Sequence, residues 1–193
     1  MITFADTGLR VIYPVTPESD HGYTAQDTVS RERYTVGSPG HRWRLTLDLE
    51  PVGINGLEAD GIIQAHIARH GITEEFETTM PQPLSTNKQT IRTLRTDASA
   101  DGGVKSIAIE YTAGLPPPIG RLIRFGQAKK IYMVTGVAGS VMSFFPALLT
   151  DVANNTTIDY NPKITVRYDD GSPRGVTIRN GVGLATVVLI EAL

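Results

Sequence analysis

Residues 114–148 read GLPPPIGRLIRFGQAKKIYMVTGVAGSVMSFFPAL. Three short apolar runs lie in this stretch, at 122–125, 131–134 and 141–145, and glycine-containing segments separate them. This punctuation predicts three strands joined by two tight hairpins. Pro146 ends the third strand, because proline cannot donate a hydrogen bond to a continuing ladder.

Two further strands are predicted just upstream, at 90–96 and 104–111. Together with the three above, they place five strands between Thr90 and Phe145. Five short strands in this length are typical of a small Greek-key barrel of the OB type. The strand count alone would also permit a small sandwich.

The clearest strand pattern is RWRLTLDLE at 42–50, where polar and apolar residues alternate strictly. A period of two indicates one face against a core and the other against water or a polar neighbour. Asn180-Gly181 is a strong signal for a two-residue hairpin between the last two strands of the chain. Further strands are predicted at 9–13, 28–36, 74–80, 164–168, 176–178 and 185–190.

Between these elements, 16–22 (TPESDHG) and 151–162 (DVANNTTIDYNP) have the composition of loops. The polar, proline-bearing segment 82–88 predicts a domain boundary. One helix is predicted at 55–71, because Asn55 can cap its start and Gly71 can end it. The chain is therefore expected to be mainly β (α+β), with the helix lying across the sheet that contains 42–50.

The composition agrees with many short strands, since 19 Gly and 12 Pro stand among 193 residues. A formal net charge of −2 provides no basic field for nucleic acid or an anionic membrane. Cysteine is absent, which excludes disulfides, thiolate metal sites and cysteine nucleophiles and fits a reducing cytoplasm. The first residues lack the basic and apolar regions of a signal peptide, so we expect a soluble protein.

No complete catalytic motif is present in the sequence. His66 and His70 have zinc-binding spacing, but Ile67 occupies the position where a metalloprotease needs its glutamate. The serine of Gly171-Ser-Pro-Arg-Gly175 is out of place for a nucleophile elbow. We therefore expect no enzyme activity, no cofactor and no bound metal.

Two pairs of acidic residues could suggest acid–base chemistry or calcium binding. Glu74-Glu75 stands at the start of a predicted strand, and Asp169-Asp170 stands in a predicted turn. The second pair lacks the further spaced oxygen ligands of a calcium loop. Both pairs are interpreted as ordinary edge and turn residues.

An OB-type barrel also raises the possibility of oligonucleotide or oligosaccharide binding, which uses exposed aromatic rings in a basic groove. Strand alternation places Phe125 with Ile123, and Tyr111 with Ile107, where they would fill the barrel core. Core packing is therefore the preferred interpretation of these rings. The residues that could otherwise form such a groove are Arg92, Arg95, Arg121, Arg124, Lys129, Lys130, Tyr111, Phe125 and Tyr132.

The segments Gly-x-Leu-Ile-x-Phe at 120–125, Lys-Lys-Ile-Tyr-x-Val at 129–134 and Phe-x-Pro-Ala-Leu at 144–148 resemble the distal tail proteins of long-tailed bacteriophages. The resemblance rests on order and spacing and covers about residues 30–193. It continues through Trp43, the helix ending at Gly71, Phe76, Pro81 and the C-terminal segment LIEAL at 189–193.

This resemblance implies a β-sandwich module with one helix, formed by residues 1–86 and 163–193, and an inserted OB-like β-barrel, residues 87–162. It implies a structural protein of the virion, assembled in the host cytoplasm into a homo-hexameric ring at the tail tip. The ring would join the tail tube protein to the tail hub protein that carries the receptor-binding parts. The barrel would project outward, where a host-surface glycan could bind.

The ring interface is predicted on the edge strand at 28–36, and its residues are Arg31, Arg33 and Tyr34. Charged residues guard a strand edge against promiscuous pairing and still leave a specific partner possible. Heterologous contacts repeated around a closed ring would pair this edge with a different surface of the next subunit. The alternative function is a small OB-type module that binds oligosaccharide or single-stranded nucleic acid.

We expect His66→Gln combined with His70→Gln to leave the metal content of the protein unchanged and close to zero, because the two-histidine spacing lacks its further ligands. Elemental analysis of the purified protein measures this directly. Stoichiometric zinc in the parent protein, lost in the double variant, would contradict the expectation.

Overall fold

The computed structural model describes residues 9–12, 17–20, 23–27, 33–37, 41–51, 65, 74–79, 93–112, 116–169, 177–179 and 182–193. In this part the protein is almost entirely β-structure, which confirms the mainly β prediction. The predicted helix lies outside the described residues except for Ala65, which is helical. The strands are β1 Leu9–Ile12, β2 Pro17–Asp20, β3 Tyr23–Asp27, β4 Arg33–Gly37, β5 Arg42–Pro51, β6 Phe76–Thr79, β7 Thr93–Thr96, β8 Ser106–Thr112, β9 Leu122–Phe125, β10 Tyr132–Ala138, β11 Val141–Phe145, β12 Ile158–Asp159, β13 Lys163–Tyr168, β14 Thr177–Arg179 and β15 Val182–Glu191.

The chain divides into two compact units. The first is discontinuous in sequence and contains residues 1–78 and 165–192. The second is built from residues 79–164, which lie between the two parts of the first. No helix among the residues described here is long and apolar enough to cross a membrane.

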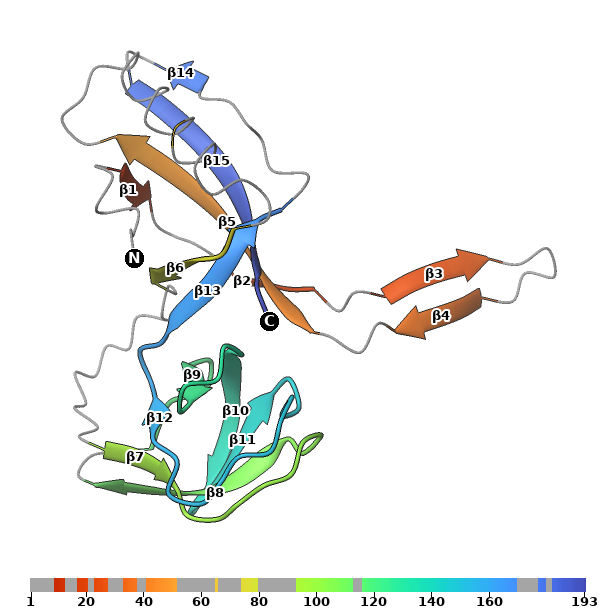
Figure 1. The fold of residues 1–193 in the computed structure, drawn as a ribbon, viewed down its shortest axis with the longest axis vertical. Coiled ribbons are helices and arrows are strands. Elements are labelled where there is room, and N and C mark those ends of the chain that lie inside the picture. The colour runs from red at the N-terminus through yellow and green to blue at the C-terminus, as the bar shows by residue number, and fades with distance from the viewer. Residues whose placement is uncertain are drawn as a thin grey trace. The chain divides into compact units, whose positions relative to one another are not determined.

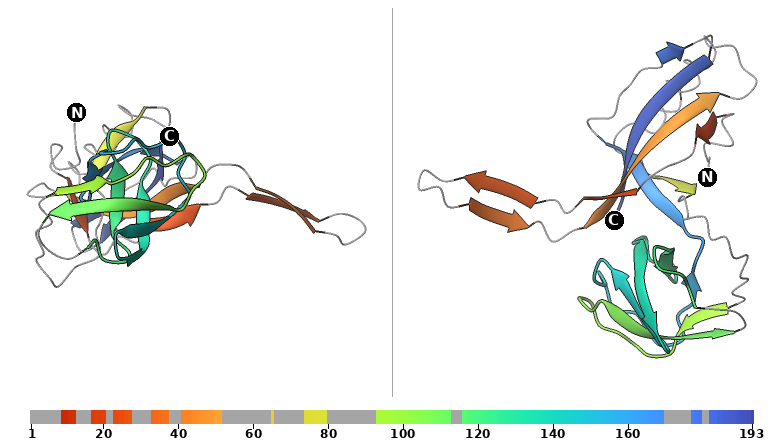
Figure 2. Two further views of the ribbon diagram at one scale, coloured as in Figure 1. Left: turned by 90° about the horizontal axis from the view of Figure 1, so that it is seen from below. Right: turned by 180° about the vertical axis from the view of Figure 1, so that it is seen from behind.

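The first unit contains a seven-stranded antiparallel sheet with the order β1-β5-β15-β13-β6, in which β2 also pairs with β5 and β14 with β15. The two long central strands, β5 and β15, are the twisted orange and blue arrows of Figure 1, and Figure 2 shows them from behind. They pair from Arg44 opposite Ile190 to Leu49 opposite Ala185.

The alternation predicted for 42–50 is confirmed. Trp43, Leu45, Leu47 and Leu49 are at most 2% exposed. On the opposite face of β5, Thr46 and Asp48 are exposed. The predicted hairpin is also confirmed, because Arg179 lies opposite Val182 and only residues 180 and 181 connect β14 to β15.

The loop predicted at 16–22 is wrong, because β2 occupies Pro17–Asp20 and pairs with β5. Its residues are polar, but the register places Glu18 opposite Arg44 and Asp20 opposite Arg42. Opposite charges at directly opposed positions favour pairing. Proline is tolerated as the first residue of a strand.

The described part of the first unit contains one large sheet. The sandwich prediction also requires a second layer over its apolar face. The helix predicted for that purpose lies outside the described residues.

The second unit is a six-stranded antiparallel sheet with the order β12-β9-β10-β11-β8-β7, so a barrel-like sheet is confirmed. Strands β9, β10 and β11 form two consecutive hairpins. The strand before them, β8, pairs with β11, and the strand after them, β12, pairs with β9. Each of these pairings completes a Greek key. The predicted runs 122–125 and 141–145 coincide with β9 and β11.

The first and last strands of this sheet meet and nearly close the barrel. Arg95 of β7 forms an isolated bridge with Thr157, next to β12. The Thr96 N–H donates to the Thr156 carbonyl at 3.0 Å, and the Asn155 N–H donates to the Thr96 carbonyl at 2.9 Å. The buried Thr96 hydroxyl donates to the Ala153 carbonyl and accepts from the Thr156 N–H, both at 2.8 Å.

The barrel therefore has six strands instead of the predicted five, because β12 lies within 151–162, which the sequence predicted to be a loop. The only strongly apolar residue near β12 is Ile158, which is buried and lies opposite Phe125 of β9. A single apolar residue among polar neighbours gives no periodic signal.

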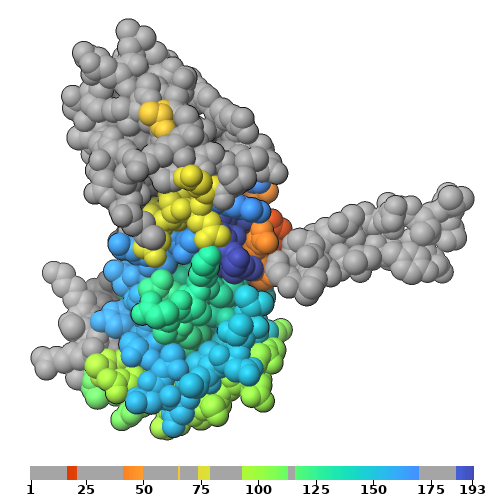
Figure 3. Space-filling view, in the orientation of Figure 1, coloured from red at the N-terminus to blue at the C-terminus, as the bar shows by residue number. Residues whose placement is uncertain are grey.

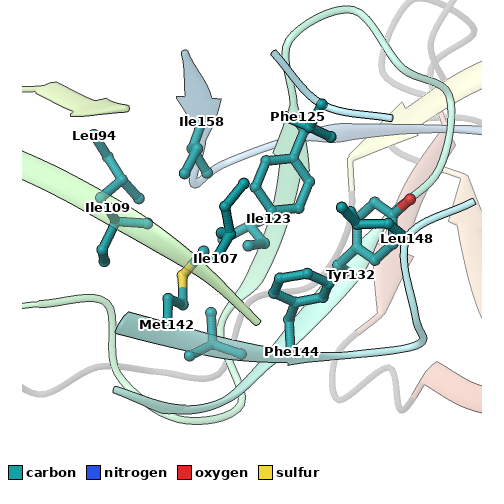
Figure 4. Close-up of a cluster of buried hydrophobic side chains, with 12 residues drawn as sticks. Leu94, Ile107, Ile109, Ile123, Phe125, Tyr132, Met142, Phe144, Leu148 and Ile158 are labelled. Atoms are coloured by element: carbon teal, nitrogen blue, oxygen red, sulfur yellow. The ribbon is translucent and has the colours of Figure 1, made fainter. Parts of the chain in front are cut away.

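Side chains from all six strands converge in the barrel core (Figure 4). Phe125, Tyr132 and Phe144 form a mutual cluster with ring centroids 5.3–5.5 Å apart in edge-to-face geometry. Such aromatic pairs are favourable beyond the area that they bury. On the face that Figure 3 shows, the green and cyan atoms of the barrel form a continuous surface.

We expect residues 87–162 to fold alone with cooperative thermal unfolding, because the strands, the closing contacts and the aromatic cluster all lie inside this segment. Circular dichroism and calorimetry measure the transition. A matched fragment of residues 87–150 lacks β12 and the closing segment and should not unfold cooperatively. A disordered 87–162 fragment would contradict the expectation.

Candidate functional site

The predicted interface segment lies in a β-hairpin. Arg33 and Tyr34 are in β4, which pairs with β3, and Arg31 lies outside the described residues. The register places Arg33 opposite Asp27 and Tyr34 opposite Gln26. Within the described residues, β4 therefore belongs to a hairpin and is not an edge of the large sheet.

The hairpin β3–β4 forms a two-stranded sheet of its own, and neither strand pairs with the two larger sheets in the part that the structure describes. An isolated two-stranded hairpin is at best marginally stable in water. Among the described residues, β3 and β4 pair only with each other, so the outer edge of each strand has backbone donors and acceptors that no other strand binds. The hairpin is therefore suited to gain stability from a partner.

The base of the hairpin is the pair β2–β5, since the chain leaves β2 at Asp20 and enters β5 at Arg42, directly opposite. His41, which precedes β5, bonds through Nε2 to the Ser19 hydroxyl at 2.8 Å. Its ring meets Trp43 edge-to-face with centroids 4.7 Å apart. These contacts hold β2 against β5 at the point where the hairpin begins.

Two charged groups fix this base to the rest of the sheet. Glu191 of β15 is completely buried, and its Oε2 accepts the Trp43 backbone N–H at 3.1 Å. Arg44 Nη2 donates to the Asp169 carboxylate at 2.7 Å, which links β5 to the end of β13. A buried carboxylate is retained only where hydrogen bonds compensate its desolvation.

Among the described residues, the acidic candidates do not form a cluster of metal ligands. Asp169 is in the ion pair with Arg44, and Glu74 and Glu75 are exposed before β6. No group of three potential metal ligands exists among the described residues. His66, His70, Asp170 and the segment 171–175 lie outside them.

The aromatic residues considered for a binding groove lie mainly in the barrel core, as the alternation predicted. Phe125 and Tyr132 are buried there, and Tyr111 packs against the same cluster. Their faces are therefore not a stacking platform for bases or sugars.

The basic residues near these rings also have structural partners. Arg124 pairs with Asp159 at 3.4 Å, and Arg121 Nε donates to the Tyr160 carbonyl at 2.8 Å. Burial lowers the pKa of the Arg121 guanidinium, and nearby Tyr160 opposes that shift. Lys130 is buried, Lys129 is exposed, and Arg92 lies outside the described residues.

Sequence reasoning missed β3 as the partner of β4. Its residues YTAQD alternate only weakly, and the available signal was the repeated Tyr-Thr pair in YTAQD and RYTVG, since both residue types favour strands.

No protein-family model matches the chain, and no curated protein sequence matches it.

We expect Glu191→Ala to lower the free energy of unfolding by about 1–3 kcal/mol, because the buried Trp43 N–H loses its acceptor. Glu191→Gln keeps an acceptor oxygen and should cost less, and Glu110→Ala, at an exposed position, is the matched control. Urea unfolding measures all three. Equal stability of Glu191→Ala and the control would contradict this role.

Proposed function

We propose that the chain is a structural protein that assembles with copies of itself into a closed ring, through the hairpin β3–β4. The observation that carries this proposal is a hairpin that pairs with neither larger sheet in the described residues but continues from a firmly held base. Free strand edges pair readily with another chain. In a homo-oligomer each subunit supplies one hairpin and one binding surface for the hairpin of a neighbour, so the two are present in equal numbers.

A closed ring requires a heterologous contact, in which one surface of a subunit binds a different surface of the next. The hairpin supplies the first surface, and Arg31, Arg33 and Tyr34 are its proposed interface residues. Arg33 and Tyr34 are in β4 of this hairpin, and Arg31 lies outside the described residues.

The resemblance to distal tail proteins supports a more specific proposal. The ring would be a homo-hexamer at the tip of a phage tail, between the tail tube protein and the tail hub protein. Such a protein is part of the virion and is assembled in the host cytoplasm. The inserted position of the second unit in the sequence agrees with the module order that the resemblance implies.

The second candidate is a ligand-binding module based on the barrel. The burial of Phe125 and Tyr132 weighs against a stacking groove for single-stranded nucleic acid. The two candidates differ in solution mass, because a ring protein assembles without added ligand, whereas a binding module titrates as a monomer.

The test replaces residues 21–41 by Asn-Gly. Asp20 and Arg42 are directly opposed, so a two-residue turn can join them and keep the β2–β5 register. We expect the parent protein to form six-fold rings as its concentration rises or when tail tube protein is added. The shortened chain should stay monomeric, as measured by mass photometry and negative-stain imaging.

The melting temperature of the shortened chain is the control for this test, because it shows whether the unit remains folded without the hairpin and the His41 contacts. Rings formed equally well by the shortened chain would remove the hairpin from the interface.

A further inference from the structure

The loop between β7 and β8 contains Asp101 followed by Gly102, a dipeptide with a chemical weakness. In such a pair the glycine nitrogen can attack the carboxyl carbon of the aspartate, because glycine has no side chain to hinder the approach. Both residues are exposed, so water can reach the reacting atoms. Sequence and exposure together therefore predict that the normal backbone link is slowly lost at this position.

The reaction conserves atoms and needs no co-reactant except water. The Gly102 nitrogen loses its proton and forms a bond to Asp101 Cγ, and a carboxyl oxygen leaves as water, which gives a five-membered succinimide ring. Water then opens the ring. Breaking the new bond to Cγ restores aspartate, whereas breaking the bond to the main-chain carbonyl carbon leaves isoaspartate. The backbone of isoaspartate runs through the former side chain and is one methylene longer.

In the structure, the nitrogen that would attack is already engaged. The Gly102 N–H donates to Asp151 Oδ1 at 2.7 Å. Hydrogen bonds to a carboxylate are stronger than those between neutral groups. Loss of the Gly102 proton would also place an amide anion beside this carboxylate, and a neighbouring like charge disfavours the charged form.

The backbone on both sides of the pair is fixed as well. Ala100 and Val152 exchange two hydrogen bonds of 2.8 Å, and the Gly103 N–H donates to the Leu148 carbonyl at 2.8 Å. Ring closure requires rotation of the backbone at Asp101. The bonds before and after Asp101 resist this rotation.

We propose that Asp101-Gly102 is a latent isomerisation site and that Asp151 suppresses the reaction by holding the Gly102 N–H. Asp151 is thus a protective residue of the barrel. An isoaspartate at 101 would displace Gly102 and Gly103 by one bond relative to Asp151 and Leu148 and disrupt both hydrogen bonds. The proposal concerns the barrel alone and does not depend on ring formation.

The test ages the full chain at physiological temperature and pH and follows the tryptic peptide 96–105. Liquid chromatography with mass spectrometry separates its aspartate and isoaspartate forms. The variants are Asp151→Ala and Asp151→Asn, and the matched control Asp97→Ala removes an equal charge from an exposed position of the same loop. The parent chain aged in urea gives the rate of the unfolded sequence.

We expect Asp101 to isomerise about fivefold faster or more in folded Asp151→Ala than in the folded parent. Asp151→Asn keeps an acceptor without the charge and should lie between them, and Asp97→Ala should match the parent. Adding Gly102→Ala to Asp151→Ala should suppress the reaction again, because a methyl group hinders the attack. It fits there, since its nearest neighbours in the parent lie at 3.6–3.7 Å.

Amide hydrogen exchange distinguishes this role from a general loosening of the loop. In Asp151→Ala, exchange should accelerate at Gly102 and not at Ala100 or Gly103, whose N–H groups have other acceptors. The proposal is overturned if Asp101 isomerises in the folded parent as fast as in urea, or no faster in Asp151→Ala than in Asp97→Ala. It is also overturned if both Asp151 variants accelerate exchange equally at all three amides, because the whole loop would then be open.

Discussion

The pairing of β5 with β15 is the constraint on which the described part of the first unit depends. It joins residues 44–49 to 185–190 in one antiparallel register and buries Leu45 and Leu47 beside Val187 and Leu189. Residues 79–164 of the second unit lie between these strands in sequence. The entropic cost of closing a loop rises only slowly with its length, so a long insertion is tolerated. A barrel that closes on itself reduces that cost further, because a folded insertion has few conformations left to lose.

The two units treat their sheet edges differently. In the second unit, a two-residue strand and the polar segment before it complete the barrel, and the buried Thr96 hydroxyl supplies bonds that a longer strand would have made. Closure removes strand edges and with them the tendency to pair with other chains. In the first unit, β3 and β4 pair only with each other among the described residues. Assembly through strand edges is therefore expected from the first unit and not from the barrel.

The sequence was informative where a strand's own pattern determines it. The strict alternation at 42–50 and the Asn180-Gly181 pair needed no knowledge of distant residues. The missed strands β2, β3 and β12 are short and polar, and each forms against a partner strand that its own pattern does not reveal, as β2 does beside β5. The bond between the Gly102 N–H and Asp151 was equally hidden, because only the bridge of Ala100 to Val152 brings the two segments together. Arg33 and Tyr34 were correctly placed in a strand, but the identity of its partner was beyond a local pattern.

Three contacts of charged groups in the described residues hold one strand to another strand or to its end. Glu191 fixes the backbone of Trp43, Asp169 holds Arg44, and Asp159 pairs with Arg124. The first two of these contacts act on β5 beside its junction with the hairpin. Hydrogen bonds that fix adjacent residues of β5 resist shear between this strand and its neighbours. A force applied to the hairpin would therefore be carried through Trp43 and Arg44 into β15 and the end of β13, which lie next to each other at the centre of this sheet.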